Sequence, residues 1–137
     1  MIDELIRLVA AAAIALAVIV AVLAARRLYR WMLDRHSGST VIDLASRYGL
    51  IHGQATVLYF FAERCEPCVQ LQEPALERLT AMREVVVRKL HAPSEADILN
   101  RFNIATVPST IVVGPDLNVR RVNVGYVDEQ TIQQQLA

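Results

Sequence analysis

Two cysteines are separated by two residues in the run Cys65-Glu66-Pro67-Cys68, and the chain has no others. They follow an apolar run and precede a segment with helical periodicity. A cysteine at the start of a helix has its thiolate stabilised by the helix dipole and by unpaired backbone N–H groups. The second sulfur, one turn along, can reach back and resolve a mixed disulfide formed at the first. The spacing therefore predicts a redox-active dithiol, in which Pro67 suits the first helical turn because it has no N–H to lose.

Metal binding and haem attachment are alternative roles for the two cysteines. A structural zinc site normally needs four ligands, and beyond the cysteines the chain offers only His36, His52 and His91, none with paired spacing. Covalent haem attachment requires a histidine after the second cysteine, where Val69 stands. We therefore expect no metal and no cofactor. Two buried, inert cysteines remain an alternative, although a CxxC between a strand and a helix favours redox chemistry.

Alternating strands and helices are expected to position the dithiol. Residues 56–62 (TVLYFFA) form a β-branched and aromatic run typical of a strand buried on both faces of a parallel sheet, and residues 85–90 predict a second buried strand. Between them, residues 66–82 have the spacing of an amphipathic helix, which Pro74 should kink. This alternation implies parallel strands with right-handed crossovers.

The rest of the globular part, which we expect to span residues 40–137 after a polar linker at residues 36–39, shows turn and capping signals. The predicted elements are a helix from Ser39 or Thr40 to Tyr48 ended by Gly49, a helix opened by a capping box at Ser94 and Asp97 and ending near Phe102, a hairpin of strands 108–113 and 119–124, and a last helix capped by Asp128 and running to Leu136.

A separate N-terminal segment, residues 1–35, accounts for much of the 54% apolar content. Leu8 to Ala25 is an unbroken run of eighteen apolar residues, close to the ~20 that cross a bilayer as a helix. In the flank that follows, Tyr29 and Trp31 are interleaved with arginines, as at a membrane interface. We expect one retained transmembrane helix. The alternative is a cleavable signal peptide, against which the acidic start and the long apolar run both argue.

Arginines are concentrated on one side of this helix. Arg26, Arg27, Arg30 and Arg35 follow it, whereas only Arg7 and the α-amino group precede it. The positive-inside rule therefore favours a cytoplasmic C-terminal domain. An extracytoplasmic domain is the alternative, because anchored dithiol domains also serve oxidising compartments.

Partners follow from the same segment and from the charge balance. We expect contact with the lipid bilayer. Ala13, Ala17, Ala21 and Ala25 recur every four residues and would line one helix face, an arrangement through which other transmembrane subunits could pack. The abundance of alanine in this segment is the favoured explanation of the pattern. Acidic and basic residues balance at 14 each, so nucleic acid is not an expected partner.

Four landmarks occur in order along the globular part. They are Val57 to Cys68, Lys89-Leu90, Phe102 to Thr110 and Val124-Gly125-Tyr126. Together they resemble the strand and active site, the next strand, the cis-proline loop and the late glycine of thioredoxin. The resemblance implies an α/β thioredoxin-like fold, a central mixed β-sheet flanked by helices, here preceded by one transmembrane helix.

The resemblance also implies roles for individual residues. Cys65 would attack a disulfide of a protein substrate, and Cys68 would release it. Pro108 would lie opposite in a cis bond, and Val107 would offer backbone hydrogen bonds to an extended substrate.

Three positions depart from the family pattern. Tyr59 stands where the family has a buried acid that helps move the proton of the resolving cysteine, Arg64 replaces a tryptophan, and Glu66 replaces a glycine. By charge, Arg64 would favour the nearby thiolate and Glu66 would disfavour it. Without the acid, Lys89 would lack its usual neighbour. Deprotonation of Cys68 would then rely on Glu63, Glu66, water or the substrate.

Taken together, these features predict a membrane-anchored thiol–disulfide oxidoreductase that reduces or exchanges disulfides of protein substrates. Its predicted site comprises the two cysteines, supported by Arg64, Glu66, Pro67 and Lys89. The alternative, from another functional class, is an accessory subunit of an integral-membrane complex that uses the domain as a docking module with little turnover. The departures at Tyr59 and Arg64 fit this second hypothesis at least as well.

Overall fold

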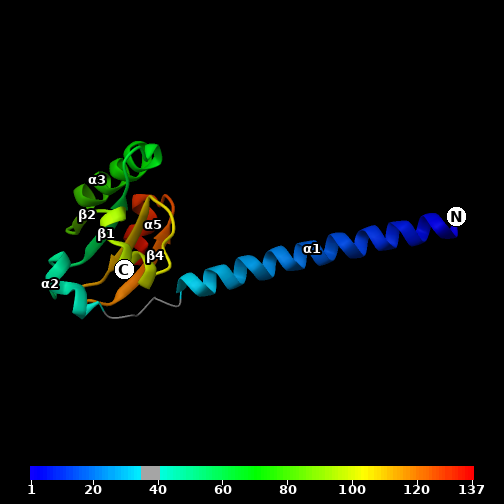
Figure 1. Cartoon of the computed structure of the whole chain (residues 1–137), viewed down its shortest axis with the longest axis horizontal. Helices are drawn as coiled ribbons and strands as arrows, with labels where there is room; N and C mark the ends of the chain where they lie inside the picture. The colour runs from blue at the N-terminus through cyan, green and yellow to red at the C-terminus, as the bar shows by residue number, and fades with distance from the viewer. Residues whose placement is uncertain (35–40) are drawn as a thin grey trace. The chain divides into compact units, whose positions relative to one another are not determined.

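The computed structural model of the chain describes residues 1–34 and 41–137 (Figure 1). The linker expected at residues 36–39 and the cap expected at Ser39 or Thr40 lie outside the described residues. The chain divides into two compact units, Met1–Met32 and Leu33–Ala137, each of which is described by itself.

Apart from Met1, the N-terminal unit lies within one long helix, α1 (Ile2–Asp34). Its apolar part, Ile2–Tyr29, has 28 residues and so rises about 42 Å, more than the ~30 Å of a bilayer's hydrocarbon core. The large apolar side chains of this part, Ile2–Tyr29, are exposed. A helix of this length and composition can cross a membrane, because all its backbone groups are bonded within the segment.

The second unit is built on a four-stranded mixed sheet in the order β2-β1-β3-β4. Strand β1 pairs in parallel with β2 and antiparallel with β3, and β3 pairs antiparallel with β4. The parallel pair and the C-terminal hairpin are therefore both as predicted. The strand bounds are β1 Thr56–Phe61, β2 Val86–His91, β3 Ser109–Val113 and β4 Val119–Val124.

Strand β1 is buried as predicted, but β2 is not. Arg88 and Lys89 on β2 are exposed, and the other four residues of β2 are half-buried. The prediction of a second buried strand was wrong because β2 lies at the edge of the sheet, where its only neighbour in the described sheet is β1.

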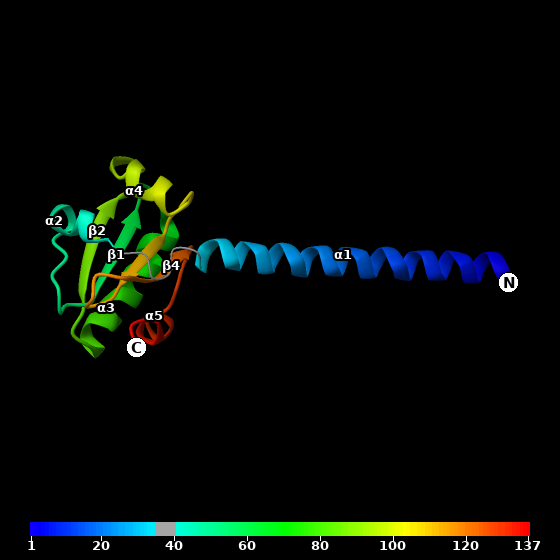
Figure 2. The same cartoon turned by 90° about the horizontal axis from the view of Figure 1, so that it is seen from below.

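Helices cover both faces of the sheet, and α3 and α5 lie on the opposite side from α4 (Figure 2). Side chains of β1 alternate between the two resulting cores, as the two-residue period of a strand requires. Leu58 and Phe60 pack with α4, whereas Val57 and Tyr59 pack with α3 and α5. The bounds of the main helices are α2 Ala45–Tyr48, α3 Glu73–Met82, α4 Ala96–Arg101 and α5 Glu129–Gln135.

Two of the predicted helix ends are confirmed. Gly49 ends α2 with a left-handed backbone (φ 63°), a conformation that glycine adopts without a steric penalty. The Asp128 carboxylate accepts a 2.7 Å hydrogen bond from the backbone N–H of Thr131 and so caps α5.

The capping box predicted at Ser94 and Asp97 was wrong. Residues Ala92–Ser94 form a 3₁₀ turn, and Glu95 precedes α4 without a side-chain cap. The Asp97 carboxylate instead pairs with Arg47, a partner fifty residues away that local sequence does not reveal.

Pro74 shapes the segment that links the cysteines to α3. The helix begins at Glu66 and runs as a π-helix from Cys68 to Gln72 before it becomes α-helical at Glu73. Proline has no N–H, and its ring crowds the carbonyl four residues earlier, which a widened turn relieves. Pro74 thus lies in the first turn of α3.

Candidate redox site

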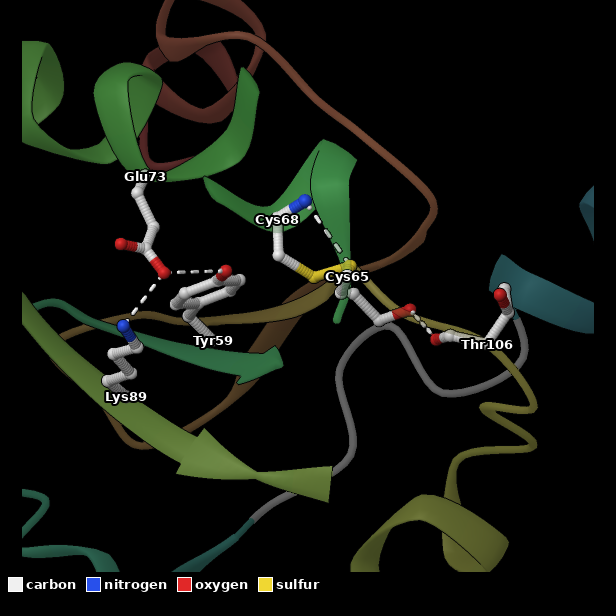
Figure 3. Close-up of a disulfide and its surroundings, with 7 residues drawn as sticks. Tyr59, Cys65, Cys68, Glu73, Lys89 and Thr106 are labelled. Atoms are coloured by element: carbon white, nitrogen blue, oxygen red, sulfur yellow. Dashed lines mark hydrogen bonds and ion pairs between the residues drawn. A yellow bond between two sulfur atoms is a disulfide. The ribbon is translucent and has the colours of Figure 1, made fainter. Parts of the chain in front are cut away.

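Cys65 and Cys68 are joined by a disulfide at the junction of β1 and the following helix (Figure 3). The two sulfurs differ in access, because Cys65 is partly exposed and Cys68 is only 1% exposed. The backbone N–H of Cys68 donates to the Cys65 sulfur at 3.2 Å. A donor of this kind also stabilises a thiolate at Cys65 once the disulfide is reduced. A substrate can therefore reach Cys65, whereas Cys68 can be reached only from within the protein.

The loop before β3 lies next to Cys65, as the position of Thr106 in Figure 3 shows. The Val107–Pro108 peptide bond is cis, as the family resemblance implied. Pro108 is buried and its carbonyl accepts a 2.9 Å hydrogen bond from the N–H of Gly125, whose φ of 90° favours glycine. Val107 and Cys65 pack against the same buried cluster. The cis-proline loop thus forms one side of the surface around the exposed sulfur.

An ion pair that the sequence did not predict lies beside the disulfide. Lys89 Nζ on β2 is 2.7 Å from Glu73 Oε1, at the start of α3. The Tyr59 hydroxyl on β1 donates to the same oxygen at 3.4 Å. Figure 3 shows the Tyr59 ring between this pair and Cys68. Lys89, which lacks the acid that the family has at position 59, therefore has Glu73 as its acidic neighbour instead.

The π-helical segment explains how Glu73 reaches this position. The Glu73 N–H bonds to the carbonyl of Cys68, five residues earlier, so the two residues lie one wide turn apart. In a regular α-helix of 3.6 residues per turn, a residue five positions on points about 140° away. A sequence analysis that assumes a regular helix therefore overlooks Glu73, and Pro74 was the only signal that the turn is widened.

The environment of Tyr59 keeps its hydroxyl protonated. Burial raises the pKa of Tyr59 well above its ordinary range, and the neighbouring Glu73 charge and hydrogen bond raise it further. Tyr59 is 1% exposed. It therefore acts as a hydrogen-bond donor to Glu73 rather than as a charged group.

An open cavity of 380 Å³ brings most of the predicted site residues together. Cys65 and Cys68 line it with Arg64, Glu66 and Lys89, and so do Glu63 and Glu73; Pro67, Val107 and Pro108 do not. Arg64 has a left-handed backbone (φ 59°), which is uncommon for a residue other than glycine. Over residues 1–34 and 41–137, no group of three His, Cys, Asp or Glu side chains has the arrangement of a metal site.

The family of the chain follows from its match to a protein-family model. The model for thioredoxin matches residues 49–137, about two thirds of the chain, which includes the disulfide and the cis-proline loop. The chain belongs to the thioredoxin family. No curated protein matches it.

Solved structures agree with this family at the level of the fold. The thioredoxin-family domain is similar to a reduced thioredoxin pre-protein of Schistosoma mansoni, with 20% identity, a TM-score of 0.56, and coverage of 69% of this chain and 88% of that one. A mutant thioredoxin of Halobacterium salinarum gives 23% identity, a TM-score of 0.53, and coverage of 61% and 73%. Thioredoxin-2 of the malaria parasite, described as a component of protein secretion machinery, gives 19% identity, a TM-score of 0.51, and coverage of 59% and 80%.

Proposed function

We propose that this protein is a membrane-anchored thiol–disulfide oxidoreductase that uses the CEPC dithiol to reduce or exchange disulfides of protein substrates. The observation that carries the proposal is the difference in access between Cys65, which is partly exposed, and Cys68, which is buried one turn along. This arrangement suits a two-step exchange, in which one sulfur meets the substrate and the other completes the reaction.

In the reducing direction, the reaction begins with the dithiol form. The Cys65 thiolate attacks one sulfur of the substrate disulfide, and the other substrate sulfur leaves as a thiolate that takes a proton from water. Cys68 then attacks the Cys65 sulfur, which re-forms the Cys65–Cys68 disulfide and releases the second substrate thiol. Two electrons pass from the protein to the substrate, so a dithiol reductant must restore the starting form.

Val107 and Pro108 are proposed to bind the substrate backbone beside Cys65. A second cavity of 380 Å³ adjoins this loop and is lined largely by apolar groups, among them Ala62, Leu99, Ile104 and Val107. Its apolar lining suits a hydrophobic side chain of an extended substrate segment. A peptide that crosses the loop would thus place its disulfide near Cys65.

Helix α1 is proposed to anchor the domain in a membrane and to restrict its substrates to proteins at the same surface. The arginines that follow the apolar stretch favour a domain on the cytoplasmic side. Labelling of intact cells with a membrane-impermeant thiol reagent, after reduction with a membrane-impermeant phosphine, tests this placement. We expect protection of Cys65 until the cells are opened, and prompt labelling before opening would overturn the cytoplasmic side.

Turnover tests the enzymatic function itself. The full chain in detergent micelles should catalyse reduction of insulin by dithiothreitol, and the Cys65→Ser variant should lose this activity. A matched control is Ser46→Ala on α2, an exposed hydroxyl remote in sequence from the CEPC run, which should retain full activity. Insulin reduction no faster than with the Cys65→Ser variant would refute the enzymatic function and favour a docking role.

A further inference from the structure

Cys68 is 1% exposed, so its thiol has almost no direct contact with bulk water. On the proposed function, on which this inference rests, the thiol must lose its proton before Cys68 can attack the mixed disulfide, because the thiolate is the nucleophile. Its neighbours in the buried cluster include Tyr59, Leu76 and Leu79, and such surroundings disfavour a free thiolate. A proton acceptor with access to this thiol would therefore control the rate of the second step.

Charged and titratable groups surround Cys68 from four elements. Three of these groups are exposed side chains of the turn before Cys65 and of the start of the helix after it. The other three come from the sheet and from α3. Among the acids, Glu73 is held in place by two hydrogen bonds, and its side chain is 29% exposed. The full set is Glu63, Arg64 and Glu66 from the turn and helix start, Tyr59 from β1, Lys89 from β2 and Glu73 from α3.

A route between Cys68 and Glu73 exists in the cavity that both line. Its 380 Å³ exceeds the share of several water molecules, about 30 Å³ each, and charged groups line it, so water can enter. Figure 3 shows the side chains of Glu73 and Cys68 on the same side of the helical segment. The Glu73 carboxylate and the disulfide lie on either side of Tyr59 (Figure 3). A proton can therefore pass from the thiol to the carboxylate through water.

We propose that Glu73 is the proton acceptor for Cys68 in the second step of the exchange. The Cys68 proton passes through cavity water to the Glu73 carboxylate, and the Cys68 sulfur attacks Cys65 as a thiolate. The Cys68–Cys65 bond forms and the Cys65–substrate bond breaks. The substrate sulfur leaves with the bonding electrons, and the proton held on Glu73 returns to it through the same water. Atoms and charge are then balanced, and Glu73 is again a carboxylate.

Tyr59 and Lys89 act as positioning residues for this acceptor. Both donate hydrogen bonds to Oε1 of Glu73, at 3.4 and 2.7 Å, and so hold the carboxylate at the edge of the cavity. Tyr59 keeps its own proton, since burial and the Glu73 charge raise its pKa. It therefore cannot replace Glu73 as the base at neutral pH.

Single-turnover oxidation of the reduced full chain by one equivalent of DTNB separates the two steps. Attack by Cys65 releases the first thionitrobenzoate in a bimolecular phase, and attack by Cys68 releases the second in an intramolecular phase. We expect Glu73→Gln to slow the second phase about 10- to 100-fold at about pH 7. This loss lies near the lower end of what removal of a positioned base causes, because cavity water can still accept the proton. The first phase should stay within about twofold of wild type, because Cys65 does not depend on Glu73.

The pH profile distinguishes proton transfer from a structural effect. In Glu73→Gln the second phase should rise about tenfold per pH unit between about pH 6 and 8, as hydroxide becomes the acceptor, whereas the wild-type rate should rise less steeply. Glu73→Asp should restore part of the rate. Glu84→Gln, at an exposed carboxylate that does not line this cavity, is the matched control and should leave the second phase unchanged. Glu63→Gln and Glu66→Gln test the other acids of the cavity, and each should slow the second phase less than Glu73→Gln does.

Each outcome bears on one proposal. A second phase in Glu73→Gln within about twofold of wild type, or an equal loss in Glu66→Gln, would overturn the role of Glu73. An absent first phase in wild type would instead refute the proposed function. If Glu73→Gln loses the near-ultraviolet circular dichroism of the folded domain, the Tyr59→Phe variant provides the test instead. This variant keeps the Glu73 carboxylate and removes one of its two hydrogen bonds. We then expect the second phase alone to slow about 2- to 10-fold, and no change would overturn the proposal.

Discussion

Gln72 provides the sharpest test of how the redox site is held to the rest of the domain. Its side chain is fully buried and makes two hydrogen bonds to the backbone of Val127: the amide N–H donates to the carbonyl at 3.0 Å, and the Val127 N–H donates to Oε1 at 3.1 Å. These bonds join the π-helical segment after Cys68 to the loop that leads from β4 into α5. Gln72→Leu keeps the approximate volume and removes both bonds.

The expected loss of stability follows from the groups left unpaired. Each deprived backbone group costs about 1–2 kcal/mol, at the lower end because Val127 is half-buried, and the apolar leucine offsets part of the sum. We therefore expect Gln72→Leu to lower the free energy of unfolding by about 1–2 kcal/mol, or the melting temperature by about 5–10 °C.

Pulse proteolysis of the full chain in detergent across a urea series measures this change, because it reports cleavage of the globular domain and is not dominated by α1. Gln70→Leu is the matched control: the same chemical change at an exposed position of the same π-helical segment should cost less than about 0.5 kcal/mol. Equal stabilities of the two variants would refute the argument that the Gln72–Val127 bonds hold the site.

Three further predictions concern the backbone before Cys65, the buried tyrosine and the second core. Arg64→Gly should raise the free energy of unfolding in urea by about 1 kcal/mol, because glycine adopts the left-handed backbone at φ 59° without a steric penalty. The same change should slow alkylation of reduced Cys65 by iodoacetamide, because it removes a positive charge beside the thiolate. Burial raises the pKa of Tyr59 above its ordinary 10.0, so the stability that this tyrosine contributes is complete below its pKa in the unfolded chain and is lost as the pH rises. The free energy of unfolding of the wild type should therefore fall above about pH 10. In the same assay, the free energy of unfolding of Tyr59→Phe should fall less steeply with rising pH. Phe102→Ala, at 1% exposure among Leu58, Phe60 and Ile98, should cost about 3–5 kcal/mol in a urea titration, and a loss below about 1 kcal/mol would contradict the assigned core.

Elements with strong local signals could be predicted from the sequence. The run TVLYFFA predicted β1 because its apolar side chains suit a strand buried on both faces, and Gly49 and Asp128 marked helix ends because their conformational and capping preferences are local. The cysteine pair was recognised for the same reason, since its chemistry depends on a spacing of three.

Features set by distant contacts could not be predicted in this way. Asp97 pairs with Arg47 rather than capping α4, and β2 is exposed because of its place at the sheet edge. Glu73 was missed because it reaches Lys89 through a widened turn that pattern analysis treats as regular helix. In each case, the decisive partner lies 16 or more residues away along the chain.

Trapping of mixed disulfides tests the central claim, that Cys65 meets the substrate and Cys68 resolves the complex, most directly. The Cys68→Ser variant of the full chain, incubated in detergent with a disulfide-bonded protein, should accumulate a covalent complex through Cys65 that dithiothreitol dissolves. Cys65→Ser should form none, because Cys68 is buried. An equal yield of complex from the two variants, or a complex formed only by Cys65→Ser, would contradict the account.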